Sequence, residues 1–135
     1  MKNDIEFLKK AIALADGSEE QIKCGVLIVQ DNEIVSAAFN SQRVDRQAVN
    51  HAEIKALQVA NRHLNSRTLQ GVTVYCSCEP CVMCLTALSL AKVDRIVYAK
   101  TMKELFPEDP MAQIDTTSFA KQLNFVPKIQ HLVVS

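Results

Sequence analysis

Segments typical of β-strands alternate along this chain with segments typical of helices, and this alternation restricts the possible folds most. Apolar stretches at 26–29 and 34–39 flank a polar turn and predict a hairpin, and alternating residues at 72–78 predict another strand. Helical periodicity marks residues 5–16, 52–63 and 80–92. This order predicts an α/β domain, a three-layer α/β/α sandwich with a central mixed sheet of about five strands.

The remaining segments carry weaker patterns. Residues 40–50 are polar and aperiodic, which predicts an irregular loop, and residues 95–99 predict a short strand. Near the end we expect a loop at 105–115, a short helix at 118–123 and a last strand at 126–134. The length of 135 residues is that of one domain, so we expect a single domain over 1–135.

Composition and charge narrow the classes of protein. The first residues are acidic where a secretion signal would be cationic and then apolar, and no apolar run reaches the ~20 residues of a membrane span. We therefore expect a cytoplasmic protein with no membrane partner. Five cysteines in such a chain favour free thiols and a metal or redox site over disulfides. The formal net charge of zero gives no general indication of nucleic-acid binding.

The main chemical signal is a pair of cysteines near a predicted helix start. Cys81 and Cys84 are three residues apart, so their thiolates lie on one helix face and can share a metal ion. Catalytic zinc takes three protein ligands and leaves a fourth position for water. His51 begins the preceding predicted helix, and helices that follow neighbouring parallel strands begin at the same sheet edge. His51 is therefore the expected third ligand, with Glu53 beside it.

Two other classes of protein also remain possible for this cysteine pattern, a redox protein and a structural zinc-binding module. Cys78-Glu79-Pro80-Cys81 follows a strand and precedes a helix, as in a thioredoxin-like redox protein. That reading leaves three residues without a role: His51, Glu53 and Cys84. A structural zinc-binding module would need a closed set of four ligands, with the fourth supplied by Cys24, Cys76 or Cys78. Buried cysteines on strands are the simpler interpretation of Cys24 and Cys76.

Taken together, His51-Ala52-Glu53 and Pro80-Cys81-Val82-Met83-Cys84 resemble the signature of the cytidine deaminase-like superfamily of zinc-dependent deaminases. The resemblance extends over residues 25–99. Within the superfamily, residues 78–84 with a histidine ligand are most similar to guanine deaminases and tRNA-specific adenosine deaminases. The resemblance implies hydrolytic removal of an exocyclic amine from a nucleobase, with one Zn²⁺ per chain held by His51, Cys81 and Cys84. It also implies that Glu53 is the catalytic proton shuttle.

The same resemblance implies residues that bind the substrate. Asn40 stands where related purine deaminases carry an asparagine that hydrogen-bonds the base, and the backbone at Ala52 and Cys78 should line the pocket. The chain departs from the pattern at Lys23-Cys24-Gly25-Val26, where relatives usually have a proline and then Gly-Ala. One wall of the pocket should therefore differ.

For the substrate, we favour guanine. Ser77-Cys78-Glu79-Pro80 resembles the guanine deaminase form of the motif, and Phe106-Pro107-Glu108-Asp109 resembles an acidic stretch that those enzymes use near the substrate. The zero net charge also favours a small nucleobase or nucleoside over RNA. The alternatives are a tRNA-specific adenosine deaminase, with tRNA as partner, or a cytosine or cytidine deaminase. Relatives of this size complete their pockets with a neighbour's residues, so we expect a homodimer.

Overall fold

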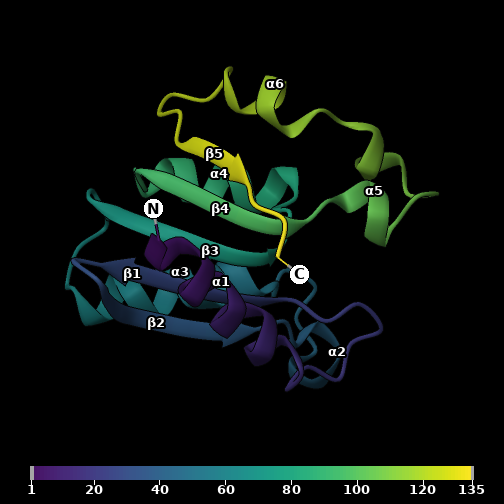
Figure 1. Cartoon of the computed structure of the whole chain (residues 1–135), viewed down its shortest axis with the longest axis horizontal. Coiled ribbons are helices and arrows are strands. Elements are labelled where there is room, and N and C mark those ends of the chain that lie inside the picture. Colours follow the sequence, from purple (N-terminus) through teal and green to yellow (C-terminus); the bar gives the residue numbers. More distant parts are fainter. Residues whose placement is uncertain (1, 135) are drawn as a thin grey trace.

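The computed structural model describes residues 2–134 and contains one five-stranded sheet with strand order β2-β1-β3-β4-β5 (Figure 1). The strands are β1 (Gly25–Gln30), β2 (Glu33–Phe39), β3 (Val72–Cys78), β4 (Arg95–Lys100) and β5 (Lys128–His131). Strand β1 pairs antiparallel with β2 and β3, whereas β3 with β4 and β4 with β5 pair in parallel. The mixed sheet predicted from the sequence is confirmed.

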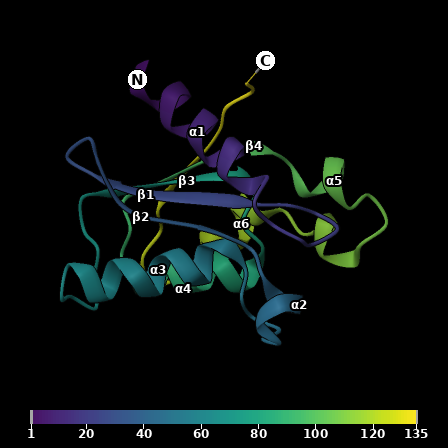
Figure 2. The ribbon, with the colours of Figure 1, turned by 90° about the horizontal axis from the view of Figure 1, so that it is seen from below.

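Helices cover both faces of this sheet. The helices of the structure are α1 (Lys2–Ala15), α2 (Gln42–Asp45), α3 (Ala52–His63), α4 (Val82–Leu90), α5 (Met102–Leu105) and α6 (Thr116–Ala120), with a 3₁₀ turn η1 at Pro110–Gln113. The single-turn helices α2 and α5 lie at one end of the sheet (Figure 1). Figure 2 shows α1 on one face and α3 and α4 on the other. This arrangement confirms the three-layer α/β/α fold.

Strand β1 is buried on both faces, which explains its unbroken apolar sequence. Val26 and Ile28 pack in the cluster shared with α3 and α4, whereas Leu27 and Val29 pack in the cluster shared with α1. A strand covered on both sides needs no polar alternation. At its start, a Cβ on Gly25 would lie 2.1 Å from the carbonyl oxygen of Ala11, so α1 can approach the sheet only because this residue is glycine.

The elements that the sequence missed are single-turn helices. The predicted loop at 40–50 contains α2, and the predicted loop at 105–115 contains η1. One turn is too short to show helical periodicity, although the polar caps are present: Thr101 and Glu104 form a capping box at α5, and the Asp115 side chain accepts hydrogen bonds at the start of α6. The last strand is also shorter than the predicted 126–134.

One disulfide, between Cys24 and Cys78, contradicts the expectation of free thiols throughout. The antiparallel register pairs Val26 with Cys76, and continuing it by two residues in each strand places Cys24 opposite Cys78, with Cα atoms 5.7 Å apart. The two cysteines are 54 residues apart in sequence, so only the strand pairing reveals their proximity. Cys76 is a buried free cysteine, as expected.

Within residues 2–134, every helix is too short or too polar to cross a lipid bilayer.

Candidate active site

The candidate site lies where α3 and α4 begin, at one end of the sheet. Strands β2 and β3 run in the same direction because each pairs antiparallel with β1, and α3 follows β2 as α4 follows β3. The prediction that these two strands are neighbours is wrong, since β1 lies between them. The helices nevertheless start at the same end of the sheet and pack against each other.

Three candidate metal ligands meet at these helix starts. His51 is the N-cap of α3, Cys81 is the N-cap of α4, and Cys84 lies in the first turn of α4. The Nδ1 atom of His51 lies 3.7 Å from Sγ of Cys81 and 3.6 Å from Sγ of Cys84. A tetrahedral zinc ion with usual Zn–N and Zn–S bonds would separate such ligand atoms by about 3.5 Å. The two distances from His51 therefore suit a shared zinc ion, and all three ligand atoms lie within 4.8 Å of one another.

The helix boundaries explain why these side chains are available. The helices begin at Ala52 and Val82, so the predicted start of the second helix at residue 80 is two residues too early. His51 and Cys81 therefore have extended backbones, with ψ of 156° and 174°, and neither side chain caps its own helix. Both point into the shared space at the positive ends of two helix dipoles, which favours anionic ligands.

The contact between Cys81 and Cys84 shifts the pKa values of the two thiols in opposite directions. A hydrogen bond from Cys84, together with the imidazole of His51, lowers the pKa of Cys81 to about 4. The same hydrogen bond and burial raise the pKa of Cys84 far above its usual value. The hydrogen bond to Cys81 in turn raises the pKa of His51. A bound cation would favour the thiolate form of both cysteines.

Glu53 is the only charged side chain buried beside these ligands in the described part of the chain. Its side chain is 5% exposed, and burial, strengthened by the negative charge of Cys81, raises its pKa to about 7. It is not one of the residues whose ligand atoms cluster within 4.8 Å of one another, which are His51, Cys81 and Cys84. A carboxyl group with a pKa near neutrality can both accept and donate a proton, as a general acid–base requires.

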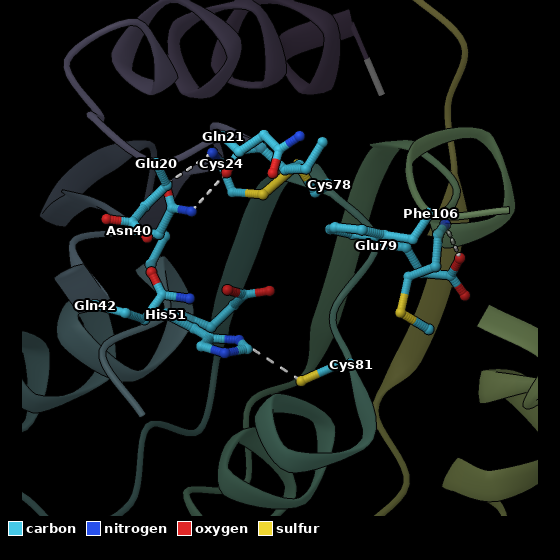
Figure 3. A pocket seen from close by; sticks show the side chains of 14 residues that line it. Glu20, Gln21, Cys24, Asn40, Gln42, His51, Cys78, Glu79, Cys81 and Phe106 are labelled. Carbon is cyan, nitrogen blue, oxygen red and sulfur yellow. Dashed lines mark hydrogen bonds between the residues drawn. A yellow bond between two sulfur atoms is a disulfide. The ribbon is translucent and has the colours of Figure 1, made fainter. Parts of the chain in front are cut away.

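A cavity of about 270 Å³ opens over this cluster (Figure 3). The residues expected to bind substrate all line it, namely Asn40, Ala52 and Cys78, together with His51, Glu53 and Cys81. Cys84 is fully buried beneath them. The structure therefore brings all seven candidate residues to one place.

The amide of Asn40 is partly engaged by the protein itself. Its Oδ1 accepts a hydrogen bond from the backbone N–H of Cys24 at 2.9 Å, and its Nδ2 donates to the carbonyl of Ile22 at 2.8 Å. One N–H hydrogen and one oxygen lone pair remain for a ligand. Asn40 thus supports the neighbouring wall of the cavity whatever it does for substrate.

The opposite walls of the cavity come from residues without a strong sequence signal. They are Glu20, Gln21 and Ile22 before β1, Gln42 in α2, Glu79 after β3, and Met102 and Phe106 around α5. The resemblance singled out Phe106, but the acidic residues after it, Glu108 and Asp109, are exposed and lie outside the lining.

Glu79 connects the metal-ligand loop to the wall around α5. One oxygen of its carboxylate accepts a hydrogen bond from the backbone N–H of Met102 at 2.8 Å, and the other accepts from the hydroxyl of Thr116 at 2.5 Å. The resulting link places Met102 and Phe106 over the cavity.

This fold, with a His-Cys-Cys cluster and a buried carboxyl group at the starts of two helices, defines the class of zinc-dependent deaminases. The family model for the cytidine and deoxycytidylate deaminase zinc-binding region matches residues 1–100. The chain belongs to this family, and its cofactor is zinc. It is an enzyme that hydrolytically deaminates a nucleobase or nucleoside.

Comparisons with individual proteins agree with this assignment. A tRNA-specific adenosine deaminase of Streptococcus pyogenes serotype M18 is 33% identical over 112 residues, which cover 82% of this chain and 70% of the relative. The crystal structure of a Bacillus subtilis guanine deaminase is 27% identical, covering 90% of this chain and 81% of its own, with a TM-score of 0.70. A structure from a study of A-to-I editing by tRNA:A34 deaminases is 23% identical in sequence. The match covers 94% of this chain and 97% of that chain with a TM-score of 0.75, which supports the fold.

Proposed function

We propose that this enzyme deaminates an adenosine in a tRNA anticodon to inosine. The observation that carries the proposal is its similarity, at 33% identity over 112 residues, to an enzyme named as a tRNA-specific adenosine deaminase. An Aquifex aeolicus protein of the same name is 35% identical over 100 residues. These relatives favour the alternative of the sequence analysis over guanine, its first choice, and they make tRNA the favoured partner.

In this proposal, His51, Cys81 and Cys84 hold one zinc ion, which supplies a Lewis acid that makes water nucleophilic at neutral pH. Glu53 accepts a proton from the attacking water, passes it to the ring nitrogen and later protonates the departing amine. Adenosine and water thus yield inosine and ammonia. Support for this role comes from the burial of Glu53 and its pKa of about 7, which make both protonation states available.

The size and walls of the cavity support a single base as the group bound. At about 270 Å³ the cavity is at the low end for ligand sites, and the remainder of an RNA would stay outside. A base must therefore leave its stack to enter, as loop nucleotides do readily. The unused N–H and lone pair of Asn40, with the backbone at Ala52 and Cys78, would contact the base.

Exposed basic side chains around the cavity support contacts with RNA phosphates. Lys23, Arg43 and Lys103 each adjoin a residue of the lining in sequence, and Arg46 directly follows the short helix α2, which contributes Gln42 to the lining. Because the formal net charge of the chain is zero, attraction to RNA would be local to this rim. Binding should therefore weaken only moderately as salt rises.

The test uses two anticodon stem-loop RNAs that differ only in the position of one adenosine, at the wobble position or one nucleotide away. We expect the zinc-loaded enzyme to form inosine in the first RNA and to leave the second and free adenosine largely unchanged. Arg46→Glu should weaken turnover of the stem-loop, whereas Lys128→Glu, an exposed substitution on β5, serves as the matched control. Equal turnover of both RNAs, or of free adenosine, would contradict anticodon recognition.

A further inference from the structure

The disulfide between Cys24 and Cys78 is part of the cavity wall. Both cysteines line the cavity, and Figure 3 shows their sulfur atoms across the opening from His51 and Cys81. The bond joins two different structures: residues 18–24, here called the wall segment, and the end of β3, three residues before the ligand Cys81. Breaking or forming this disulfide therefore changes the wall of the cavity itself.

The two sides of the bond differ in how firmly they are held. Cys78 ends β3, and its backbone pairs with Lys100 of β4, so it would remain in place without the disulfide. The wall segment consists of bends and irregular residues and contains no helix or strand. Breaking the disulfide would therefore release mainly the wall segment, which carries Glu20, Gln21 and Ile22 of the lining.

Asn40 and Arg43 provide further attachments of the wall segment. Besides the side-chain bonds of Asn40 to Ile22 and Cys24, the backbone N–H of Asn40 donates to the carbonyl of Cys24 at 3.1 Å, and its carbonyl accepts from the Ser18 hydroxyl at 2.8 Å. The backbone N–H of Arg43 donates to the Glu20 carboxylate at 3.1 Å, and its guanidinium donates to the carbonyl of Glu19 at 3.0 Å. These hydrogen bonds would persist after reduction and keep the wall segment near the cavity. Loss of the disulfide should therefore loosen the wall without unfolding it.

We propose that Cys24 and Cys78 form a reversible redox modification site that sets the affinity of the pocket for its substrate. A thiol reductant such as reduced glutathione acts on the oxidised form: its thiolate attacks Sγ of Cys24, the S–S bond breaks, and Cys78 leaves as a thiolate that takes up a proton. The thiolate of a second reductant molecule then attacks the mixed disulfide, Cys24 leaves as a thiolate that takes up a proton, and the two reductant molecules are released as their disulfide. Two electrons and two protons reach the protein, and a disulfide oxidant reverses the step.

Exposure and position support this chemistry. Cys24 is partly exposed, whereas Cys78 is only 6% exposed, so a reductant approaching from the cavity mouth meets Cys24 first. The zinc ligands and Glu53 lie on α3 and α4, outside the wall segment. Reduction should therefore change substrate binding and leave the chemical step unchanged.

The expected rise in KM on reduction follows from the entropy lost when substrate binding orders the wall segment. In the oxidised form the wall segment is fixed before substrate binds, whereas in the reduced form binding must order it. We expect KM to rise about fivefold on reduction while kcat stays the same. This effect rests on the proposed deaminase function, whereas the redox change and the loosening of the wall do not.

The experiment compares the zinc-loaded enzyme equilibrated with oxidised or reduced glutathione and then freed of both. Differential alkylation with mass spectrometry reports the state of each cysteine, hydrogen exchange reports the mobility of residues 18–24, and elemental analysis verifies equal zinc content. KM and kcat are measured on the wobble-adenosine stem-loop. The double variant C24A/C78A should behave as the reduced enzyme in both buffers, and C76A, which removes a buried free thiol from the same strand, should respond as the wild type does.

The outcomes separate the two proposals. A Cys24–Cys78 disulfide that forms and is reduced, with faster exchange at 18–24 and a higher KM after reduction, supports the redox site. Failure of the disulfide to form in the oxidised buffer, or equal exchange and equal KM in both states, overturns it. If reduction speeds hydrogen exchange at residues 18–24 but the stem-loop is not turned over in either redox state, the proposed function is wrong. The redox control of substrate affinity is then overturned with it.

Discussion

Replacing Glu53 by glutamine isolates proton transfer from metal binding. Glutamine has nearly the same size as glutamate and fits the buried position, where the side chain is 5% exposed. It cannot carry a proton between water and the base. Because Glu53 lies outside the ligand cluster of His51, Cys81 and Cys84, we expect one zinc ion per chain to remain bound in the variant.

The expected loss of turnover is large. General acid–base catalysis contributes about 10²–10⁴-fold, which corresponds to roughly 3–5 kcal/mol of transition-state stabilisation. Single-turnover formation of inosine in the stem-loop measures this step directly, while elemental analysis and thermal melting report zinc content and folding. KM should change little, since the loss falls on the chemical step.

Glu79→Gln is the matched control, because it makes the same substitution in another carboxyl group of the cavity lining. The Glu79 carboxylate accepts hydrogen bonds from Met102 and Thr116, and glutamine keeps one acceptor oxygen. We expect kcat within about threefold of the wild type and a higher KM, because the wall around α5 is loosened. If E53Q retained more than about a tenth of wild-type turnover, or lost its zinc, the role assigned to Glu53 would be wrong.

Further predictions concern the metal, stability and assembly. C81S/C84S should abolish zinc binding in elemental analysis, and unchanged zinc content would refute the ligand assignment. Asp4 is 3% exposed and accepts hydrogen bonds from Tyr75 and Arg95. Burial raises the pKa of Asp4, but the two hydrogen bonds and the charge of Arg95 lower it more, so the pKa lies below its usual value. Asp4→Asn should therefore cost about 2 kcal/mol in urea unfolding at pH 7, and this difference should shrink as the pH falls below about 3.9 and through the folded-state pKa; an unchanged difference at pH 3 would contradict it. Sedimentation equilibrium at micromolar concentration should give twice the chain mass of 15.0 kDa, and an active species of 15.0 kDa would exclude the dimer.

The sequence predicted the long elements and the metal cluster because both depend on short-range patterns. Cys81 and Cys84 share a helix start by spacing alone, and His51 joins them because β2 and β3 run in the same direction, even though β1 separates them. Helical and strand periods extend over several turns or pleats in α1, α3 and β3, so their bounds were nearly correct.

The features that were missed depend on contacts between distant segments. The Cys24–Cys78 disulfide follows from the antiparallel register of two strands, and no local pattern reveals that register. The cavity walls at Glu20 and Phe106 belong to irregular segments that are positioned by hydrogen bonds from Asn40 and Glu79. The preference for guanine rested on a few motif residues, whereas similarity over 82% of the chain favours the tRNA enzymes.

The ratio of kcat/KM for the wobble-adenosine stem-loop to kcat/KM for free guanine decides between a tRNA adenosine and guanine as the substrate of this enzyme. Both substrates are measured on the same zinc-loaded preparation, with inosine quantified by mass spectrometry and ammonia release quantified for guanine. We expect efficient inosine formation in the stem-loop and a ratio far above one. Turnover of guanine with none of the stem-loop would contradict it.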